Sequence, residues 1–288
     1  MRLNEYLKEL FGSKVYKVAI NAGFTCPNRD GTKGSRGCIF CSAGGSGDFA
    51  GDPGMSITGQ IEAGKKLVGS KIKSGRFIAY FQAYTNTYAP PERLRKVFYE
   101  AIRHPDIVAI SIATRPDALP EDVLELLAEL NAIKPVWVEL GLQTIHKESI
   151  RYIRRAYENA EYDRAVKELH RRGIEVITHV ILGLPGESAE DMLSTVRYVV
   201  DSGAEGIKLQ LLHVLKETDL ADEYELGHIK VMSEDEYIDL LKRCMEIIPD
   251  SMVIHRLTGD GPKKLLIAPL WSGNKKHVLN RIQKEVIG

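Results

Sequence analysis

The stretch IVAISIATRPDALPEDVLELLAELNAIKPVWVELGL (residues 107–142) decides the fold class of this chain. It begins and ends with short runs rich in β-branched residues, IVAISIA (107–113) and VWVELGL (136–142), which are typical of buried strands. Between them, the apolar residues of PEDVLELLAELNAI (120–133) recur at spacings of three and four, as on one face of a helix. A strand, a helix and a second strand in this order favour two parallel strands joined by a right-handed crossover.

The same alternation extends along most of the chain. Four more buried strands are predicted, two before this unit and two after it. A second clear helical pattern covers residues 158–173. Six strands that alternate with helices predict an α/β fold with a parallel sheet. We expect one catalytic domain over residues 1–215 and a C-terminal extension over residues 216–288, which is the candidate substrate-binding region. The four additional strands are predicted at residues 15–20, 77–82, 176–182 and 206–212.

Length, charge and hydropathy narrow the class of protein. A chain of 288 residues is long enough for a single large domain, and 39 Lys and Arg residues balance 39 Asp and Glu residues. The net charge therefore indicates neither nucleic acid nor membrane as a partner. The N-terminal residues lack the apolar core of a signal peptide, and no apolar run is long enough to span a bilayer. We expect a soluble cytoplasmic protein with no membrane partner.

Three of the four cysteines lie in one glycine-rich loop after the first predicted strand, CPNRDGTKGSRGCIFC (26–41). Thiolates are the usual ligands of iron–sulfur clusters. Three ligands, Cys26, Cys38 and Cys41, would leave one iron of a cubane cluster open, so that a small molecule can bind and react there. Phe40 precedes the last cysteine, where its ring can shield the cluster or pack beside the bound molecule.

Other interpretations of this loop stay open. A zinc site would need a distant fourth ligand, whereas structural zinc sites usually show two close pairs of cysteines. A redox-active pair at Cys38 and Cys41 would leave the third cysteine unexplained, and no helix is expected to begin at its first cysteine. A non-catalytic module that binds zinc or an iron–sulfur cluster is therefore an alternative to an enzyme. The isolated Cys244 lies on an apolar helical pattern and is interpreted as a core residue.

The cysteine loop and its position resemble those of the radical S-adenosylmethionine (SAM) enzymes, over roughly residues 15–215. The common spacing in that family is C-x3-C-x2-C, whereas this chain has C-x11-C-x2-C. Long first spacings occur in the branch that contains the Elongator catalytic subunit. The resemblance implies a partial (β/α)6 barrel of the TIM type, a [4Fe-4S] cluster and SAM as cofactors, and an external one-electron donor. It also implies reductive cleavage of SAM to a 5′-deoxyadenosyl radical, which abstracts hydrogen from the substrate.

The resemblance also assigns residues to the cofactors. In GLQTIHKESIRYIRR (141–155) it places Gln143 and Arg155 against SAM. An amide suits ribose hydroxyls, and a guanidinium suits the methionine carboxylate. Glu139 and His179 are further candidates for the ribose, with a buried ion pair and a satisfied interior histidine as the respective alternatives. The expected cofactor contacts are Phe40, Ala83, Thr85, Glu139, Gln143, Arg155, His179 and Gly183, and the expected cluster ligands are Cys26, Cys38 and Cys41.

The segment 255–282 resembles the end of a small bacterial family, close to the Elongator branch, that is implicated in modifying the wobble uridine of transfer RNA (tRNA). Its members are implicated in converting a 5-carboxymethylaminomethyl group to a 5-aminomethyl group. This resemblance implies tRNA as a partner, and a small metabolite is the alternative substrate. Each substrate-side candidate also has a structural alternative, as a helix cap, a surface charge or a packed ring. The candidates are Tyr84, Tyr88, His255, Arg256, Trp271 and Lys275.

Overall fold

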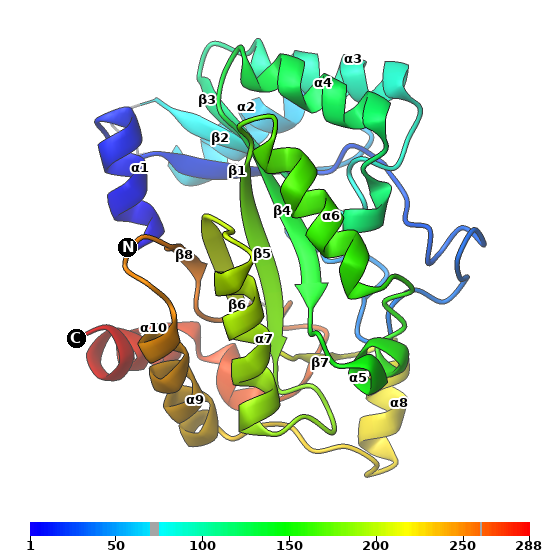
Figure 1. Ribbon diagram of the computed structural model, residues 1–288, viewed down its shortest axis with the longest axis vertical. Coiled ribbons are helices and arrows are strands. Elements are labelled where there is room, and N and C mark those ends of the chain that lie inside the picture. The colour runs from blue at the N-terminus through cyan, green and yellow to red at the C-terminus, as the bar shows by residue number, and fades with distance from the viewer. Residues whose placement is uncertain (70–74, 260) are drawn as a thin grey trace.

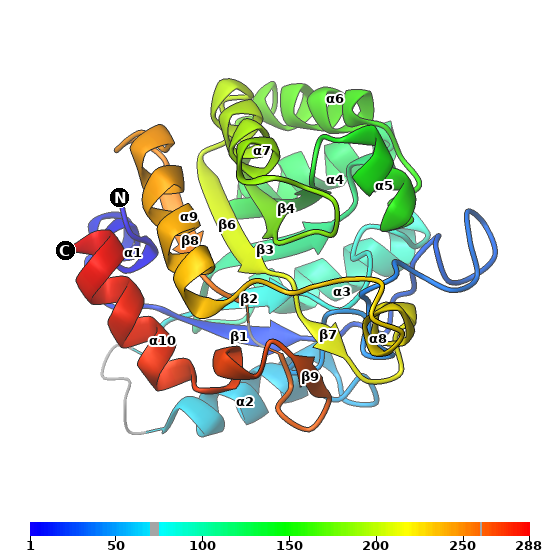
Figure 2. The same cartoon turned by 90° about the horizontal axis from the view of Figure 1, so that it is seen from below.

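Seven parallel strands form one curved sheet, which is the wall of a partial barrel (Figures 1 and 2). The computed structural model describes residues 1–69, 75–259 and 261–288. The strand order is β1-β2-β3-β4-β5-β6-β8, so that successive strands of the chain are neighbours in the sheet up to β6. The strands are β1 (Tyr16–Ile20), β2 (Phe77–Phe81), β3 (Ile107–Thr114), β4 (Val136–Gln143), β5 (Glu175–Leu182), β6 (Gly206–Leu211) and β8 (Val253–Arg256).

Helices cover the outer face of the curved sheet, as Figure 2 shows. This arrangement confirms the expected α/β fold, a partial barrel of the TIM type with a C-terminal extension. None of the helices in the described ranges is long and apolar enough to cross a membrane. The helices are α1 (Leu3–Phe11), α2 (Ile57–Val68), α3 (Pro91–Ile102), α4 (Glu121–Asn131), α5 (Lys147–Tyr152), α6 (Asn159–His170), α7 (Ala189–Asp201), α8 (Asp219–Glu225), α9 (Glu234–Ile247) and α10 (Lys275–Ile282).

The seventh strand, β8, comes from the segment assigned to the C-terminal extension, and the sequence did not predict it. It pairs in parallel with β6. Its sequence VIHR is short, and its polar half, His255 and Arg256, lines a cavity inside the barrel, which explains the weak strand signal. A second pair of strands, β7 (Val214–Leu215) and β9 (Leu266–Ala268), forms a short antiparallel ribbon. The C-terminal extension therefore contributes directly to the barrel.

The sequence encodes the starts of the crossover helices. Ser188 and Ser233 each accept a hydrogen bond from the backbone N–H three residues later, in the capping boxes that begin α7 and α9. The central strands β3 and β4 are mostly buried on both faces, and every residue of β2 is buried. This burial is expected where helices cover one face of a parallel sheet and the other face is the barrel interior.

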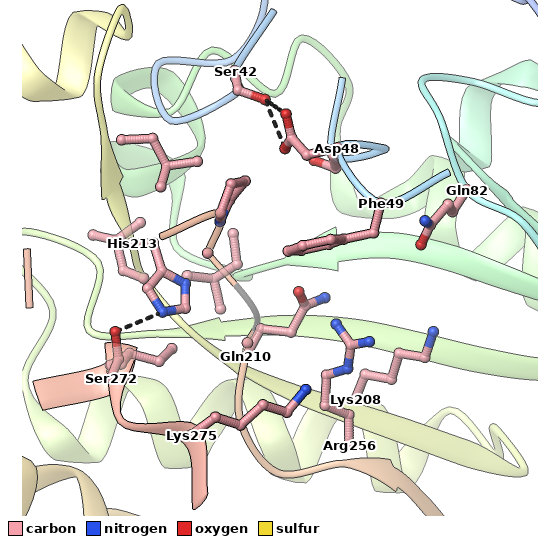
Figure 3. A pocket seen from close by; sticks show the side chains of 18 of the residues that line it. Ser42, Asp48, Phe49, Gln82, Lys208, Gln210, His213, Arg256, Ser272 and Lys275 are labelled. Atoms are coloured by element: carbon pink, nitrogen blue, oxygen red, sulfur yellow. Dashed lines mark hydrogen bonds between the residues drawn. The ribbon is translucent and has the colours of Figure 1, made fainter. Parts of the chain in front are cut away.

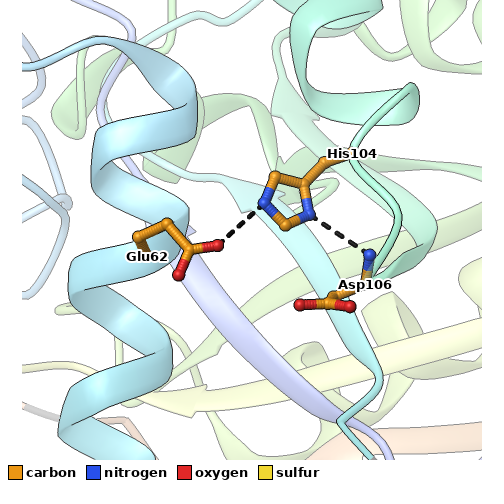
Figure 4. A group of neighbouring side chains, drawn as sticks. All are labelled: Glu62, His104 and Asp106. Carbon is orange, nitrogen blue, oxygen red and sulfur yellow. Dashed lines mark hydrogen bonds and ion pairs between the residues drawn. The ribbon is translucent and has the colours of Figure 1, made fainter.

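A cluster of ionisable side chains lies outside the barrel, between α2 and the start of β3 (Figure 4). The ligand-type atoms of Glu62, His104 and Asp106 lie within 4.8 Å of one another, close enough to hold a metal ion. However, the Lys65 ammonium lies 2.7 Å from Glu62 and also forms an ion pair with Asp106. The cluster therefore already contains its own cation, and we interpret it as a surface ion-pair network.

Candidate functional site at the carboxyl ends of the strands

The cysteine loop follows β1 and folds back on itself. The backbone N–H of Arg29 donates to the carbonyl of Cys26 at 2.8 Å, and that of Cys41 donates to the carbonyl of Cys38 at 2.9 Å. The Arg29 guanidinium also donates to the carbonyls of Cys41 at 2.8 Å and Ser42 at 2.6 Å. These bonds connect the two ends of the motif, so that cysteines far apart in the loop reach the same place.

All three thiols line one cavity of about 200 Å³. Three protein thiols are one short of the four ligands of a closed structural zinc site, whereas they leave one iron of a cubane cluster open. The Asn28 side-chain amide donates to Cys38 Sγ at 3.5 Å, and bonds of this kind orient the thiolates of clusters. The donor set fits a [4Fe-4S] cluster with three protein ligands better than a single zinc ion.

Gln143 lines the same cavity from the end of β4. Its φ is +68°, a conformation that few residues other than glycine adopt. Its side-chain Oε1 is buried and has no hydrogen-bond partner among the described residues. A buried acceptor without a donor is costly. A ribose hydroxyl would supply that donor, so this side chain fits SAM bound beside the cysteines.

The barrel interior beside this cavity contains buried charge. The Glu139 carboxylate accepts hydrogen bonds from Lys17 at 3.0 Å and Ser111 at 2.6 Å, and it also contacts His179 Nε2 at 2.7 Å and pairs with Lys208. Burial alone would raise the pKa of Glu139, but the two lysines outweigh burial and hold this pKa well below its usual range. Burial lowers the pKa of His179 to about 4, so its ring is neutral at pH 7.

A larger cavity of about 690 Å³ adjoins the cysteine cavity (Figure 3). In Figure 3, the Arg256 guanidinium and the Lys275 ammonium extend toward the region around Gln210. On the opposite side, Ser42 donates to the Asp48 carboxylate at 3.0 Å. The walls of the two cavities have residues in common, so the two spaces meet inside the barrel mouth. The shared residues are Phe40, Ser46, Tyr80, Gln82, Ile181, Gln210 and Arg256.

Basic side chains are frequent among the described residues of the larger cavity. These residues include five Lys or Arg residues and the carboxylate of Asp48, although the chain as a whole has no net charge. A cavity of this volume and charge suits an anionic small molecule, or an anionic group that belongs to a larger one. The basic residues are Lys17, Lys208, Arg256, Lys263 and Lys275.

The sequence matches two known families. Residues 26–199 match the family described as the Radical SAM superfamily, and residues 204–287 match the Radical_SAM C-terminal domain. The chain belongs to the radical SAM superfamily. Enzymes of this superfamily use a [4Fe-4S] cluster and SAM, so the expected cofactors are confirmed.

Three proteins illustrate the relationship of this radical SAM enzyme to others. It is 49% identical over 284 residues to YtqA of Bacillus subtilis, and the aligned region covers 99% of this chain and 88% of YtqA. It is 27% identical over 163 residues to the tRNA uridine(34) acetyltransferase of Methanocaldococcus jannaschii, and the aligned region covers 56% of this chain and 30% of that protein. The solved structure of Methanocaldococcus infernus Elp3 with an N-terminal deletion matches with a TM-score of 0.69 at 18% identity, covering 94% of this chain and 63% of that one. The resemblance to the Elongator branch is confirmed.

Most residues expected to contact SAM line the cysteine cavity of this radical SAM enzyme. Ala83 instead packs against the cysteine loop, where a Cβ added to Gly47 would lie 2.6 Å from the Ala83 Cβ. Gly183 has a φ of +89° and lines a separate hollow beside Met232. The structure thus brings six of the eight expected residues together at the cysteines. These are Phe40, Thr85, Glu139, Gln143, Arg155 and His179.

Arg155 is used differently from what the sequence suggested. It is 1% exposed, and each of its five N–H groups donates to an acceptor within the protein. The guanidinium also stacks on Tyr157, with its carbon 4.5 Å from the centroid of the Tyr157 ring. In this arrangement Arg155 holds the loop after β4, and a contact with the methionine carboxylate would require it to release some of these acceptors. The acceptors are the carbonyls of Leu142, Thr144 and Tyr157 and the side chain of Asn159.

The two tyrosines of the loop after β2 point to different places. Tyr84 lines the cysteine cavity, with a φ of +59° and the Arg29 guanidinium 5.6 Å from its ring centroid. The Tyr88 hydroxyl forms a hydrogen bond of 2.9 Å with Thr32 Oγ1, on the exposed part of the cysteine loop. Tyr84 is therefore close to the expected cofactors, and Tyr88 instead fixes the loop that holds the cysteines.

The candidates from the C-terminal segment also divide into two groups. His255, Arg256 and Lys275 line the larger cavity, as a role in substrate binding requires. The Trp271 indole N–H donates to a backbone carbonyl at 3.0 Å, and its ring packs 5.8 Å from that of Tyr237. These contacts engage both the polar and the apolar part of Trp271, which is partly buried, and a role in stacking a base stays a prediction.

Sequence reasoning missed several residues of the larger cavity, among them Lys208, Tyr80 and Phe49. Lys208 and Tyr80 lie within buried strands, where the apolar pattern concealed them. A lysine in the middle of the buried run GIKLQLL (206–212) was the available signal, because an unpaired charge there would be costly. Phe49, which is 60% exposed, lines the cavity from the cysteine loop, and nothing in its sequence context distinguished it.

Proposed function

We propose that this radical SAM enzyme modifies the side chain of the wobble uridine of tRNA. The observation that carries this proposal is the junction of the two cavities, in which three thiols on one side meet a larger basic space on the other. The similarity to an enzyme named for acetylating uridine 34 of tRNA supports this choice of substrate. The finer reaction that we propose is conversion of a 5-carboxymethylaminomethyl group to a 5-aminomethyl group.

The residues of the smaller cavity have roles in binding the cofactors. Cys26, Cys38 and Cys41 would hold the [4Fe-4S] cluster, and Gln143 would accept a hydrogen bond from SAM. When bound, these cofactors supply a 5′-deoxyadenosyl radical that abstracts hydrogen from the substrate, after reduction by an external electron donor. The Phe40 ring lies in the wall shared by both cavities, where it would exclude water from the reacting groups.

The residues of the larger cavity orient the substrate in this proposal. Arg256 and Lys275 would bind the carboxylate of the uridine side chain, since a guanidinium and an ammonium both suit a carboxylate. Arg256 lines both cavities, so an anion bound there would lie near the junction. Other basic residues of the C-terminal segment, such as Lys263, would approach RNA phosphates.

Mass spectrometry of tRNA nucleosides provides the test. Cells that lack the gene should accumulate the 5-carboxymethylaminomethyl nucleoside and lose nucleosides derived from the 5-aminomethyl form. A plasmid encoding the wild-type chain should restore the profile, and one encoding Cys38→Ala should not. An unchanged wobble-uridine profile in the deletion strain would refute tRNA as the substrate.

A small metabolite is the second candidate substrate, because the larger cavity falls within the volume range of small-molecule sites. Binding measurements distinguish the two. A tRNA substrate should bind with an affinity that falls steeply as salt rises, since phosphate contacts release counterions. An affinity for tRNA that is weak and insensitive to salt would favour the metabolite.

A further inference from the structure

Lys208 is a buried amine in the wall of the larger cavity. It lies in the middle of β6 and is 3% exposed. It forms an ion pair with Glu139 and donates to the Tyr80 hydroxyl at 3.2 Å, and its Nζ lies 4.5 Å from the centroid of the Tyr80 ring. Figure 3 shows its side chain among those that line this cavity. Lys208 thus reaches the substrate space while most of its surface is protected from water.

Among the described residues, Lys208 shares its one carboxylate partner, Glu139, with a second lysine. Lys17 shares the Glu139 carboxylate, with Nζ 3.0 Å from Oε1, and Arg256 adds a guanidinium from β8. Burial is the largest influence on Lys208, and together with Lys17 and Arg256 it outweighs Glu139 and lowers the pKa of Lys208 to about 7. A large fraction of Lys208 is therefore neutral at pH 7. Within residues 1–69, 75–259 and 261–288, the titratable and charged groups that face it are Lys17, Tyr80, Glu139, His179, His255 and Arg256.

The neighbouring histidines add no further positive charge around Lys208. Burial lowers the pKa of His179 to about 4 and lowers the pKa of His255 well below its usual range, so both rings are neutral at pH 7. The Gln210 amide donates to His179 Nδ1 at 2.9 Å, which leaves the Nε2 proton to bond Glu139. With both ring nitrogens engaged, His179 is poorly placed to accept a proton. The Lys208 amine is the group of this cluster that is best placed to do so.

We propose that Lys208 is the catalytic base that takes a proton from the substrate in the larger cavity. In this step, a bond between hydrogen and a substrate nitrogen or oxygen breaks, and its electron pair stays on that atom. A new N–H bond forms at Lys208 Nζ. The Glu139 carboxylate and the Tyr80 hydroxyl oxygen stabilise the resulting ammonium, and the step needs no oxidant or reductant.

The chemistry of Lys208 specifies a class of substrate. A base at this position suits an ammonium or hydroxyl group next to the carbon that loses hydrogen, because the freed lone pair stabilises the neighbouring carbon radical. The secondary amine of a 5-carboxymethylaminomethyl group is protonated at neutral pH and is such a group. This identification of the amine rests on the proposed function, whereas the titration of Lys208 does not.

Activity measurements on two variants test the role of Lys208. Lys208→Met removes the proton acceptor, and Lys208→Arg keeps a permanent charge at the same place. Both should lose about 100-fold or more of substrate turnover, while cluster content and substrate-independent cleavage of SAM stay near wild type. Wild-type turnover should rise with pH to a plateau above about 7, and the residual turnover of both variants should lack this rise.

Two controls separate catalysis from folding. Lys134→Met also removes a partly buried lysine, one that donates to the carbonyls of His104 and Ile107 outside the cavities, and it should leave turnover unchanged. In Lys208→Ala, a small primary amine such as ethylamine should restore part of the turnover. Loss of SAM cleavage together with turnover in every Lys208 variant would show a structural role and would overturn the inference.

A second measurement does not depend on the identity of the substrate. Protein labelled with 13C at lysine Cε should show one resonance, absent in Lys208→Arg, that titrates near pH 7. A midpoint near 10.4, the usual value for lysine, would overturn the proposed base whatever the enzyme modifies. If the resonance titrates near pH 7 and tRNA is nevertheless unchanged in the cell, the proposed RNA substrate fails and the base is retained.

Discussion

Lys17 on β1 and Glu139 on β4 form an ion pair across the interior of the barrel, with Nζ 3.0 Å from Oε1, although their strands are not neighbours in the sheet. The two residues are 122 positions apart in the chain. The Glu139 side chain is 0% exposed, so its charge depends on partners from opposite parts of the curved sheet. The curvature of the sheet therefore brings together the charges that keep Glu139 ionised inside the barrel.

Removing the Glu139 charge should destabilise the fold. Glu139→Gln leaves Lys17 and Lys208 without their shared carboxylate, and breaking a buried ion pair costs about 3–5 kcal/mol of unfolding free energy. Urea denaturation measures the loss. Glu62→Gln is the matched control, because its partner Lys65 lies in a surface network, where ion pairs contribute about 1 kcal/mol or less. Equal losses in the two variants would contradict this account.

Stability should depend on pH through His179. Its pKa is lowered to about 4 in the folded protein, against about 6.5 in the unfolded chain. Between these values the unfolded chain binds the additional proton, so stability rises with pH from about 4 to 6.5, by roughly 3 kcal/mol. His179→Gln should reduce this rise by about that amount, as measured by denaturant unfolding across the window at fixed ionic strength, and His255, whose pKa is also lowered, should account for a rise that remains. His228→Gln, at an exposed site, should leave the rise at its wild-type size. A rise of wild-type size in His179→Gln would contradict the prediction.

Substitution of each of the three loop cysteines should lower the iron content of the protein, whereas substitution of the fourth cysteine should not. After anaerobic reconstitution, alanine variants of Cys26, Cys38 and Cys41 should lose bound iron and sulfide and the reductive cleavage of SAM. Cys244→Ala should keep both, since this residue is 0% exposed in the core. Native purification with zinc and no formation of 5′-deoxyadenosine under reduction would instead support a zinc-binding module.

Substitutions of Gln143 and Arg155 should affect different properties, SAM binding and stability respectively. Gln143→Ala removes the buried acceptor and should weaken SAM binding about tenfold, the effect of about one hydrogen bond, with cluster content unchanged. Arg155→Lys should mainly lower stability, because its five hydrogen bonds hold the loop after β4. Calorimetric SAM titrations and thermal unfolding measure the two effects. Weak SAM binding at normal stability in Arg155→Lys would support the carboxylate contact expected from the sequence.

Lys275 and its neighbour should differ in their effect on substrate binding. Lys275 lines the larger cavity, and Lys276 is exposed on the same helix. Lys275→Ala should weaken binding of tRNA carrying the 5-carboxymethylaminomethyl group more than binding of unmodified tRNA, whereas Lys276→Ala should affect the two RNAs equally. Fluorescence anisotropy at several salt concentrations measures both. Equal losses for the two RNAs in Lys275→Ala would indicate a phosphate contact rather than recognition of the side chain.

The sequence by itself determined the features that depend on local pattern. Short, continuous apolar runs identified the six strands from β1 to β6, because burial on both faces of a sheet requires such runs. The three cysteines identified the metal chemistry, since few other roles require three thiolates in one loop. Gln143 was also predicted from a short motif whose spacing is local, and it lines the cysteine cavity.

Only the tertiary structure decided how distant residues combine. Lys17, Tyr80, Lys208 and Arg256 come from four strands and meet around Glu139 because the sheet curls. The acceptors that engage Arg155 and the packing of Trp271 likewise depend on the final arrangement of loops and helices. The pKa of Lys208 and the formation of strand β8 also depend on the tertiary structure. Each depends on burial and on partners brought close by folding, and neither is a property of the local sequence.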